Sequence, residues 1–266
     1  SIFYMTIFLI AEVTAVSLLV KYISGTSLWI TAGIVVITSL IYTLYGGLRA
    51  SLFTDNIQFI IFGLLLLIVF SNLISLNSSQ FNFDYISQNK PYLLSSGYLP
   101  NFTAGLTFFI AVAATNLFHQ GNWQRVYAAK NGEVLKKSLI FSFLIILPIV
   151  FLMGFSGLVA VSQNEAVTPD LAFFSLILKE NGTQLSVIII ILAISLTISS
   201  IDTLINAISS LIIVDGNKIF KGKKDYLKFS KQIMILLSII AFFTASKGLS
   251  ILYLFLLADL LCCAAV

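Results

Sequence analysis

The sequence predicts an all-α polytopic membrane protein. Of its 266 residues, 59% are hydrophobic and only 10% are charged, and the mean hydropathy is +1.03. Soluble domains average about 25% charged residues, so a soluble fold is excluded. A helix needs about 20 apolar residues to cross the hydrocarbon core, and runs of that length recur along the chain. No alternating pattern typical of a membrane barrel is present, so we expect helices, which satisfy their own backbone polar groups in lipid.

Eight apolar runs are candidate spans. A polar stretch at 76–101 separates the third run from the fourth, and it is too long for a tight turn and too mixed for a span. We therefore expect a first half at 1–75, an extracellular connection at 76–101, and a second half at 102–266. The eight runs cover about 1–20, 28–46, 52–75, 102–120, 135–161, 185–213, 230–246 and 249–266.

Loop charge predicts the orientation. Basic residues gather after the fourth and sixth spans, which places those loops in the cytoplasm, with Arg49 after the second span on the same side. Acidic residues fall between the fifth and sixth spans, which we expect outside. The net charge of +4 is explained by these loops, so the lipid bilayer is an expected partner and nucleic acid is not. The basic residues are Arg125, Lys130, Lys136, Lys137, Lys218, Lys221, Lys223, Lys224 and Lys228, and the acidic ones are Glu165, Asp170 and Glu180.

The sixth span carries an unusual stripe of oxygen-bearing side chains. Ser195, Ser199, Asp202 and Asn206 recur at helical spacing, with Thr203 beside them and Ser200 about a quarter turn away. A charged residue in mid-span costs about 2.5–3.5 kcal/mol, so it needs a reason. Hydroxyl, carboxylate and carbonyl oxygens suit a hard cation such as sodium. The alternative is that the hydroxyls only pack helices together, which would not require a carboxylate.

Three other carboxylates lie at or within spans. Asp55 either caps the start of the third helix or lies on an ion pathway, and these alternatives stay open. Glu12 and Asp259 lie in the middle of the first and eighth spans, where each would face a water-filled cavity or pair across helices.

An enzyme is not expected. His119 is the only histidine, and a single histidine is more often structural than catalytic. No nucleophile spacing, metal cluster or phosphate-binding loop accompanies it. We therefore predict no catalytic residues and no organic cofactor.

Three motifs together resemble the sodium/solute symporter family, whose members carry sugars, proline, sialic acid, pantothenate or urea. The first runs Tyr42-Thr43-Leu44-Tyr45-Gly46-Gly47-Leu48-Arg49-Ala50 and continues to Thr54, Asp55 and Gln58. The second is Gln124-Arg125 followed by Ala128-Ala129-Lys130, and the third is Ser199-Ser200 with Asn206, Ser209-Ser210 and Asp215.

The resemblance implies a leucine-transporter-like inverted-repeat helix bundle. The eight spans would be core helices three to ten, with the first two core helices expected upstream of Ser1. On this expectation the chain is part of a longer protein, lacks part of its site, and is inactive alone. The resemblance also implies a sodium site made by Ser199, Ser200 and the Leu196 carbonyl, with Asp55 on the sodium route to the cytoplasm.

Two departures from the family pattern bear on the solute. Asp202 stands where relatives often carry a small residue, so we expect it to serve an additional cation, a proton or a cationic substrate group, with Ser195, Thr203 and Asn206 nearby. Sugar carriers place an aromatic gate where this chain has Gly121, which disfavours a sugar. The candidate substrate or gate residues are Asn116, His119, Gln120, Asn122 and Trp123.

The predicted function is therefore sodium-coupled symport of a small polar solute by alternating access, in the cell membrane. Sodium and an unidentified solute are the expected partners. A transporter-like sensor domain and a proton-coupled symporter, with Asp202 or Asp55 titrating, remain alternatives. A third alternative is a structural membrane subunit.

Overall fold

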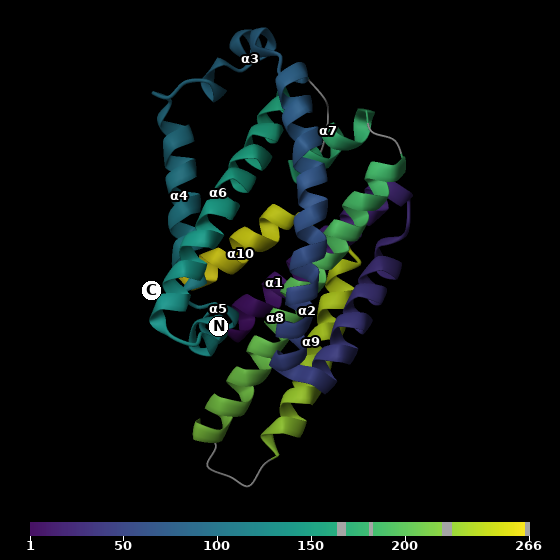
Figure 1. The fold of residues 1–266 in the computed structure, drawn as a ribbon, viewed down its shortest axis with the longest axis vertical. Helices are drawn as coiled ribbons and strands as arrows, with labels where there is room; N and C mark the ends of the chain where they lie inside the picture. Colours follow the sequence, from purple (N-terminus) through teal and green to yellow (C-terminus); the bar gives the residue numbers. More distant parts are fainter. Residues whose placement is uncertain (164–168, 181–182, 220–224, 264–266) are drawn as a thin grey trace. The chain divides into compact units, whose positions relative to one another are not determined.

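The computed structural model describes residues 1–163, 169–180, 183–219 and 225–263, and these form helices and short connections without a β-strand (Figure 1). The all-α prediction is therefore confirmed for the described part of the chain. Glu165, Lys221, Lys223 and Lys224, which entered the orientation argument, lie outside it. The helices are α1 (Ile2–Ser24), α2 (Leu28–Gln80), α3 (Phe83–Asn89), α4 (Leu99–Asn116), α5 (Gln120–Ala128), α6 (Gly132–Ser162), α7 (Ala172–Glu180), α8 (Thr183–Ile219), α9 (Tyr226–Ala245) and α10 (Ile251–Cys263), with 3-10 turns at Pro91–Leu93 and Pro169–Leu171.

Several helices are long and apolar enough to cross a membrane. Among the described residues five qualify by length and composition, and a sixth is added if α4 and α5, bent by 59°, form one broken span. The apolar part of α2, Leu28–Asn72, has 45 residues, about twice what one pass requires. Helix α2 thus covers two of the predicted spans, 28–46 and 52–75, while Ile251–Leu260 is a shorter apolar helix. The count of eight passes stays a prediction.

Two compact units make up the chain. The first comprises Ser1–Leu64, Ala111–Arg125 and Ile190–Val266, and the second comprises Leu65–Ile110 and Val126–Ile189. Packing defines these units, whereas the predicted halves at 1–75 and 102–266 are defined by an inverted repeat. The repeat therefore also stays a prediction.

Helix α1 is the centre of the first unit. It is apolar nearly all round, as a helix enclosed by others is expected to be, and Met5, Leu9 and Val13 are almost fully buried. It packs against α9 and α10, and the rings of Phe8 and Phe255 meet edge to face at 4.8 Å. This core holds α8 through Ile201 and Ile208, which positions the polar face of α8.

The second unit has a smaller core between α6 and α7. Val159 and Ala160 on α6 pack with Leu176 on α7. The Asn82 side chain caps α3 by accepting a hydrogen bond from the Tyr85 amide at 3.0 Å. Much of the polar stretch 76–101 is therefore ordered into the end of α2, α3 and a 3-10 turn.

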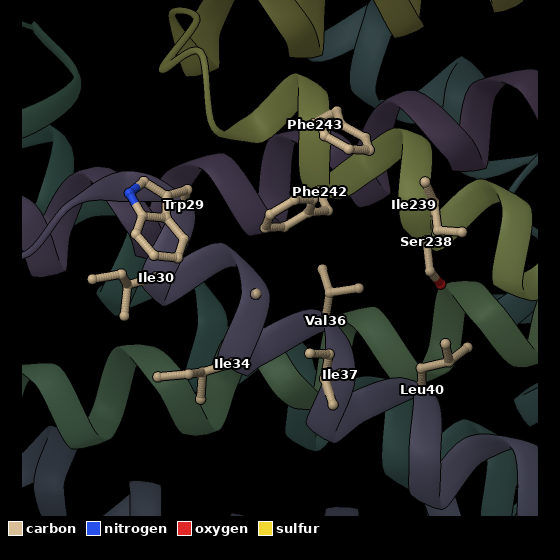
Figure 2. A pocket seen from close by; sticks show the side chains of 11 residues that line it. Trp29, Ile30, Ile34, Val36, Ile37, Leu40, Ser238, Ile239, Phe242 and Phe243 are labelled. Carbon is tan, nitrogen blue, oxygen red and sulfur yellow. The ribbon is translucent and has the colours of Figure 1, made fainter.

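An apolar groove of about 660 Å³ lies between the first part of α2 and α9. Figure 2 shows Phe242 of α9 extending toward the α2 backbone, with Ile34 and Ile37 on the opposite wall. A Cβ atom on Gly33 would lie 3.4 Å from the Phe242 ring, so the absence of a side chain at Gly33 allows the ring to pack against the α2 backbone. Ile34 is 63% exposed, and such outward apolar side chains suit a lipid surface better than water.

Candidate functional site

Gly47 breaks α2 within the first unit. Its φ of 52° and ψ of −149° lie outside the helical region, and L-residues rarely adopt this conformation. The break divides α2 into a first leg, 28–46, and a second leg, 48–80. Polar side chains on both legs can therefore face the same region of α8.

Asp202 on α8 accepts hydrogen bonds from both legs of α2. The Tyr42 hydroxyl of the first leg donates to Oδ2 at 2.7 Å, and the Ser51 hydroxyl of the second leg donates to Oδ1 at 2.8 Å. The Thr54 hydroxyl approaches Oδ2 at 3.5 Å. Asp202 has no exposed surface, and hydrogen bonds to a charged acceptor offset the desolvation cost of burial. The carboxylate thus fastens α8 to both sides of the Gly47 break.

Asp55 forms a second contact between α2 and α8. The Ser199 hydroxyl donates to Asp55 Oδ1 at 2.5 Å, and the Arg125 guanidinium pairs with Oδ2 at 2.8 Å. Asp55 lies inside the second leg of α2 and does not begin a helix. The alternative in which Asp55 acts as a helix cap is therefore wrong, because the helix starts before it.

Arg125 is also held by α8. Its Nη2 donates to the Thr203 hydroxyl at 2.7 Å, and that hydroxyl donates to the Ser199 carbonyl at 2.8 Å. Asp55, Ser199, Thr203 and Arg125 therefore form one polar network. The side chains of Asp55 and Arg125 are 22% and 36% exposed, so the pair is only partly enclosed by the protein.

Gly121 allows α5 to approach α8 closely. A Cβ atom at this position would lie 2.6 Å from Thr203 Cγ2 and 2.9 Å from His119 Cε1, closer than real atoms pack. Residues four apart share a helix face, so the close approach at Gly121 brings Arg125 against the same part of α8.

The predicted sodium ligands separate into two surroundings. Ser199 and Asp55 meet, whereas the Ser200 side chain lies near the Glu12 carboxyl of α1. Leu196, whose carbonyl was the expected third ligand, is 39% exposed. Of the other residues on the predicted oxygen stripe, Thr203 joins the Arg125 network, Asn206 lies buried beside Gly47, and Ser195 is partly buried.

The candidate gate residues surround the break between α4 and α5. The Asn122 amide donates to Asn116 Oδ1 at 2.8 Å, and the Trp123 indole donates to the Leu117 carbonyl at 2.8 Å. The His119 ring meets the Tyr4 ring edge to face at 6.2 Å. Gln120 begins α5. The cluster braces the bend between the two helices.

Besides Asp202, two carboxylates within predicted spans of the first unit form no ion pair with the described residues. These are Glu12, which lies near Ser200, and Asp259 on α10, which is 5% exposed and lies near Thr115. One oxygen of Asp259, Oδ1, is buried without a hydrogen-bond partner in the described part of the chain. A buried carboxylate without a counter-charge is costly, which favours a cationic ligand nearby.

The donor set is compatible with sodium but not with a site built from several carboxylates or histidines. Within the described ranges, no three His, Cys, Asp or Glu side chains converge in a way that could hold a metal. Sodium accepts hydroxyl and carbonyl oxygens with a single carboxylate, and Ser199 and Asp55 offer such oxygens. The Arg125 guanidinium holds one of the Asp55 oxygens in this structure.

Sequence reasoning missed three residues that bind the carboxylates of α2 and α8: Tyr42 and Ser51, which donate to Asp202, and Arg125, which pairs with Asp55. Tyr42 and Arg125 were present in the motifs that carry the family resemblance, and Arg125 also served the orientation argument, but neither was assigned a role in the site. The available signal was the rarity of polar groups near the ends of apolar runs, which marks them as partners for buried carboxylates.

Comparisons with known proteins agree with the motifs. The family model described as the sodium:solute symporter family matches residues 1–263. A spermidine transporter, DUR31 of Candida albicans (strain SC5314 / ATCC MYA-2876), is 26% identical over 271 residues, covering 98% of this chain and 49% of the relative. The chain thus spans about half the length of that relative. No solved structure matches.

Proposed function

The chain belongs to the sodium:solute symporter family, and from this we propose that it contributes the transport core of a sodium-coupled symporter for a small polar solute. Members of the family are integral membrane proteins and transporters, which are not enzymes, and the chain is an integral membrane protein of this kind. Coupling to sodium and alternating access are part of the proposal. The observation that carries it is the contact of Ser199 with Asp55 across α8 and α2.

Sodium in this proposal binds between Ser199 and Asp55. The two side chains present oxygens from two different helices, so one ion bound by both would favour one arrangement of those helices. Arg125 supports a release step, since a carboxylate oxygen that pairs with the guanidinium is no longer available to sodium. Withdrawal of Arg125 would open the site, and its return would expel the ion.

The broken span gives Arg125 a way to move. Helices α4 and α5 meet at 59° with residues 117–119 between them, and discontinuous helices are common where transporters bind ions and solutes. Movement of α5 would carry Arg125 toward or away from Asp55. At about 100 mV, each charge moved inward supplies about 2.3 kcal/mol, enough for an approximately fifty-fold solute gradient.

The finer fold belongs to the same proposal. The eight predicted spans would be core helices three to ten of a leucine-transporter-like inverted repeat, with halves at 1–75 and 102–266. The kink at Gly47 supports this, because it lies between two spans that the predicted topology requires to be separate.

A cationic amine is the solute class that the site favours. Glu12 and Asp259 lie in the first unit without an ion-pairing partner among the described residues. Asp202, in contrast, is satisfied by Tyr42 and Ser51 and does not require a ligand. The printed name of the Candida albicans relative, a spermidine transporter, also supports a solute with protonated amines.

Uptake into proteoliposomes tests the proposal. The protein would be supplied with labelled spermidine, urea, an amino acid and a sugar, each with and without an inward sodium gradient. We expect sodium-stimulated uptake, largest for spermidine. Uptake that follows a pH gradient and ignores sodium would favour the proton-coupled alternative, and no uptake of any solute would favour the sensor alternative.

A further inference from the structure

A second, polar cavity lies beside the Gly47 break, away from the Asp55 network. It has a volume of about 320 Å³ and is formed by α2, the end of α8 and the start of α9, all in the first unit. Its polar lining residues are Thr43, Asn206, Ser209, Ser230 and Lys231. Neither the proposed sodium site nor the proposed solute site uses this cavity.

The backbone at the Gly47 break forms part of the cavity wall. Gly46 and Gly47 line the cavity, and a Cβ atom on Gly47 would come within 4.0 Å of Asn206 Oδ1. Gly47 also has a positive φ that other residues rarely adopt. The backbone here therefore bends and carries no side chain that would fill the cavity.

Asn206 is a buried amide that lacks a partner. The residue is 7% exposed, and its Nδ2 has no hydrogen-bond acceptor among the described residues. A buried donor without an acceptor costs about 1–3 kcal/mol. A half turn of the side chain exchanges the amide nitrogen and oxygen, so the NH2 group can face the cavity.

The remaining lining groups favour an anion. Lys231 brings a positive charge and makes no ion pair with the residues that the structure describes. Ser209 and Ser230 add two hydroxyls to the lining; here the Ser209 hydroxyl donates to Ser230 Oγ at 3.4 Å and the Ser230 hydroxyl donates to the Leu227 carbonyl at 3.0 Å, and a hydroxyl can rotate toward a better acceptor. No Asp or Glu lines the cavity. An ammonium, an amide and hydroxyls around one space match the several acceptor oxygens of an oxyanion.

The second leg of α2 adds to this preference. It begins directly after Gly47, which lines the cavity, so the positive end of its dipole lies at the cavity wall. Anions bind at such helix starts. Here the helix start coincides with the unpartnered Asn206 amide, which is an independent indication of a missing acceptor.

We propose that this cavity binds a phosphate group, with Lys231 and Asn206 as its principal ligands. The predicted orientation places it at the cytoplasmic end of the spans. The phosphate comes either from a free phosphate compound or from the headgroup of an anionic lipid, and the chemistry of recognition is the same for both.

Thermal denaturation of the purified protein tests this proposal. Inorganic phosphate is added to protein in detergent against chloride at equal ionic strength, which removes general screening as a cause. In parallel, the protein is reconstituted in phosphatidylcholine bilayers with and without phosphatidylglycerol. We expect a rise in Tm in at least one arm. A rise with inorganic phosphate identifies a free phosphate as the source, and a rise with phosphatidylglycerol alone identifies a headgroup.

Two variants and one control make the test specific to the cavity. Lys231→Gln removes the charge, and Asn206→Asp replaces a donor with an acceptor of the same shape. Each should weaken binding, so that the phosphate or phosphatidylglycerol concentration that gives half the maximal rise in Tm increases by about five-fold or more. Lys228→Gln changes an exposed lysine of α9 that does not line the cavity and should leave the response unchanged. No Tm rise in either arm, or equal responses from Lys231→Gln and Lys228→Gln, would overturn the proposal.

Discussion

The guanidinium of Arg125 lies 2.8 Å from the carboxylate of Asp55, between the broken span and the second leg of α2. This pairing occupies an oxygen that the proposed sodium site requires. The chain's own cation and the transported cation would therefore exclude one another at Asp55, because one carboxylate oxygen cannot be fully coordinated by both.

Replacing Arg125 should strengthen sodium binding. In Arg125→Gln the competing charge is removed, so we expect the half-saturating sodium concentration for solute uptake to fall by about five-fold, the equivalent of about 1 kcal/mol for a partly exposed ion pair. Arg49→Gln, at an exposed position near the kink, is the matched control and should behave as the wild type. A sodium requirement that rises in Arg125→Gln would mean that the arginine holds the site open for sodium instead of competing with it.

Removing the Ser199 hydroxyl should weaken sodium binding. Ser199→Ala takes one oxygen from the site, and we expect the half-saturating sodium concentration to rise by about five-fold or more. Ser200→Ala should have a smaller effect, because Ser199 is the serine whose hydroxyl donates to Asp55. Sodium-dependent uptake by each variant provides the measurement. An equal or larger effect of Ser200→Ala would show that Ser200 is a principal sodium ligand, as the family resemblance implies.

The sequence predicted the chemistry of this region better than its pairings. Helical spacing placed Ser199, Asp202 and Asn206 on one face of α8, and Asp202 and Asn206 are indeed buried. Periodicity cannot reveal which residues of distant helices meet, because it reports only the faces of a single helix. Tyr42 and Arg125 reach Asp202 and Asp55 through contacts separated by 160 and 70 residues.

The sequence also predicted the helices of the fold but not the bend within α2. Runs of apolar residues identified the long helices, because a segment that crosses lipid must consist mainly of apolar residues. They did not reveal that a single residue, Gly47, separates the two legs of α2. The only sign of a positive φ in a sequence is a glycine, and a glycine alone does not identify a bend. The predicted boundary at 46–52 was the gap between two apolar runs, 28–46 and 52–75, and the bend lies at its start.

Tyr42 and Ser51 should contribute to stability through Asp202. Tyr42→Phe or Ser51→Ala removes one donor from a fully buried carboxylate, and each should reduce the free energy of unfolding by about 1–3 kcal/mol. The double variant should differ from the sum of the single variants, because both act on one carboxylate. Thermal denaturation in detergent measures these effects, with Tyr45→Phe, whose side chain is 90% exposed, as a control. Additive effects would indicate that Asp202 does not link the two legs.

Gly121→Ala should disrupt the contact of α5 with α8. The added methyl would lie 2.6 Å from Thr203 Cγ2, so α5 must move and carry Arg125 away from Asp55. We expect a loss of about 1–3 kcal/mol, as for other overpacked positions. Gly105→Ala on α4 is the control, because nothing lies within 4 Å of a Cβ atom there and alanine favours a helix. Equal melting temperatures for the two variants would contradict the close approach.

Glu12 and Asp259 should determine the preference for a cationic solute. Glu12→Gln and Asp259→Asn keep the shape of each side chain but remove its charge, so attraction to a protonated amine is lost. We expect KM for spermidine uptake to rise by about ten-fold in each, equivalent to about 1.4 kcal/mol, with the sodium dependence unchanged. Asp84→Asn, at an exposed position in α3, is the control. If KM stays constant in both variants, the two carboxylates serve only the packing of α1 and α10, and the solute is recognised elsewhere. A rise in one variant alone would assign the contact with the amine to that carboxylate, because Glu12 and Asp259 lie on different helices, α1 and α10.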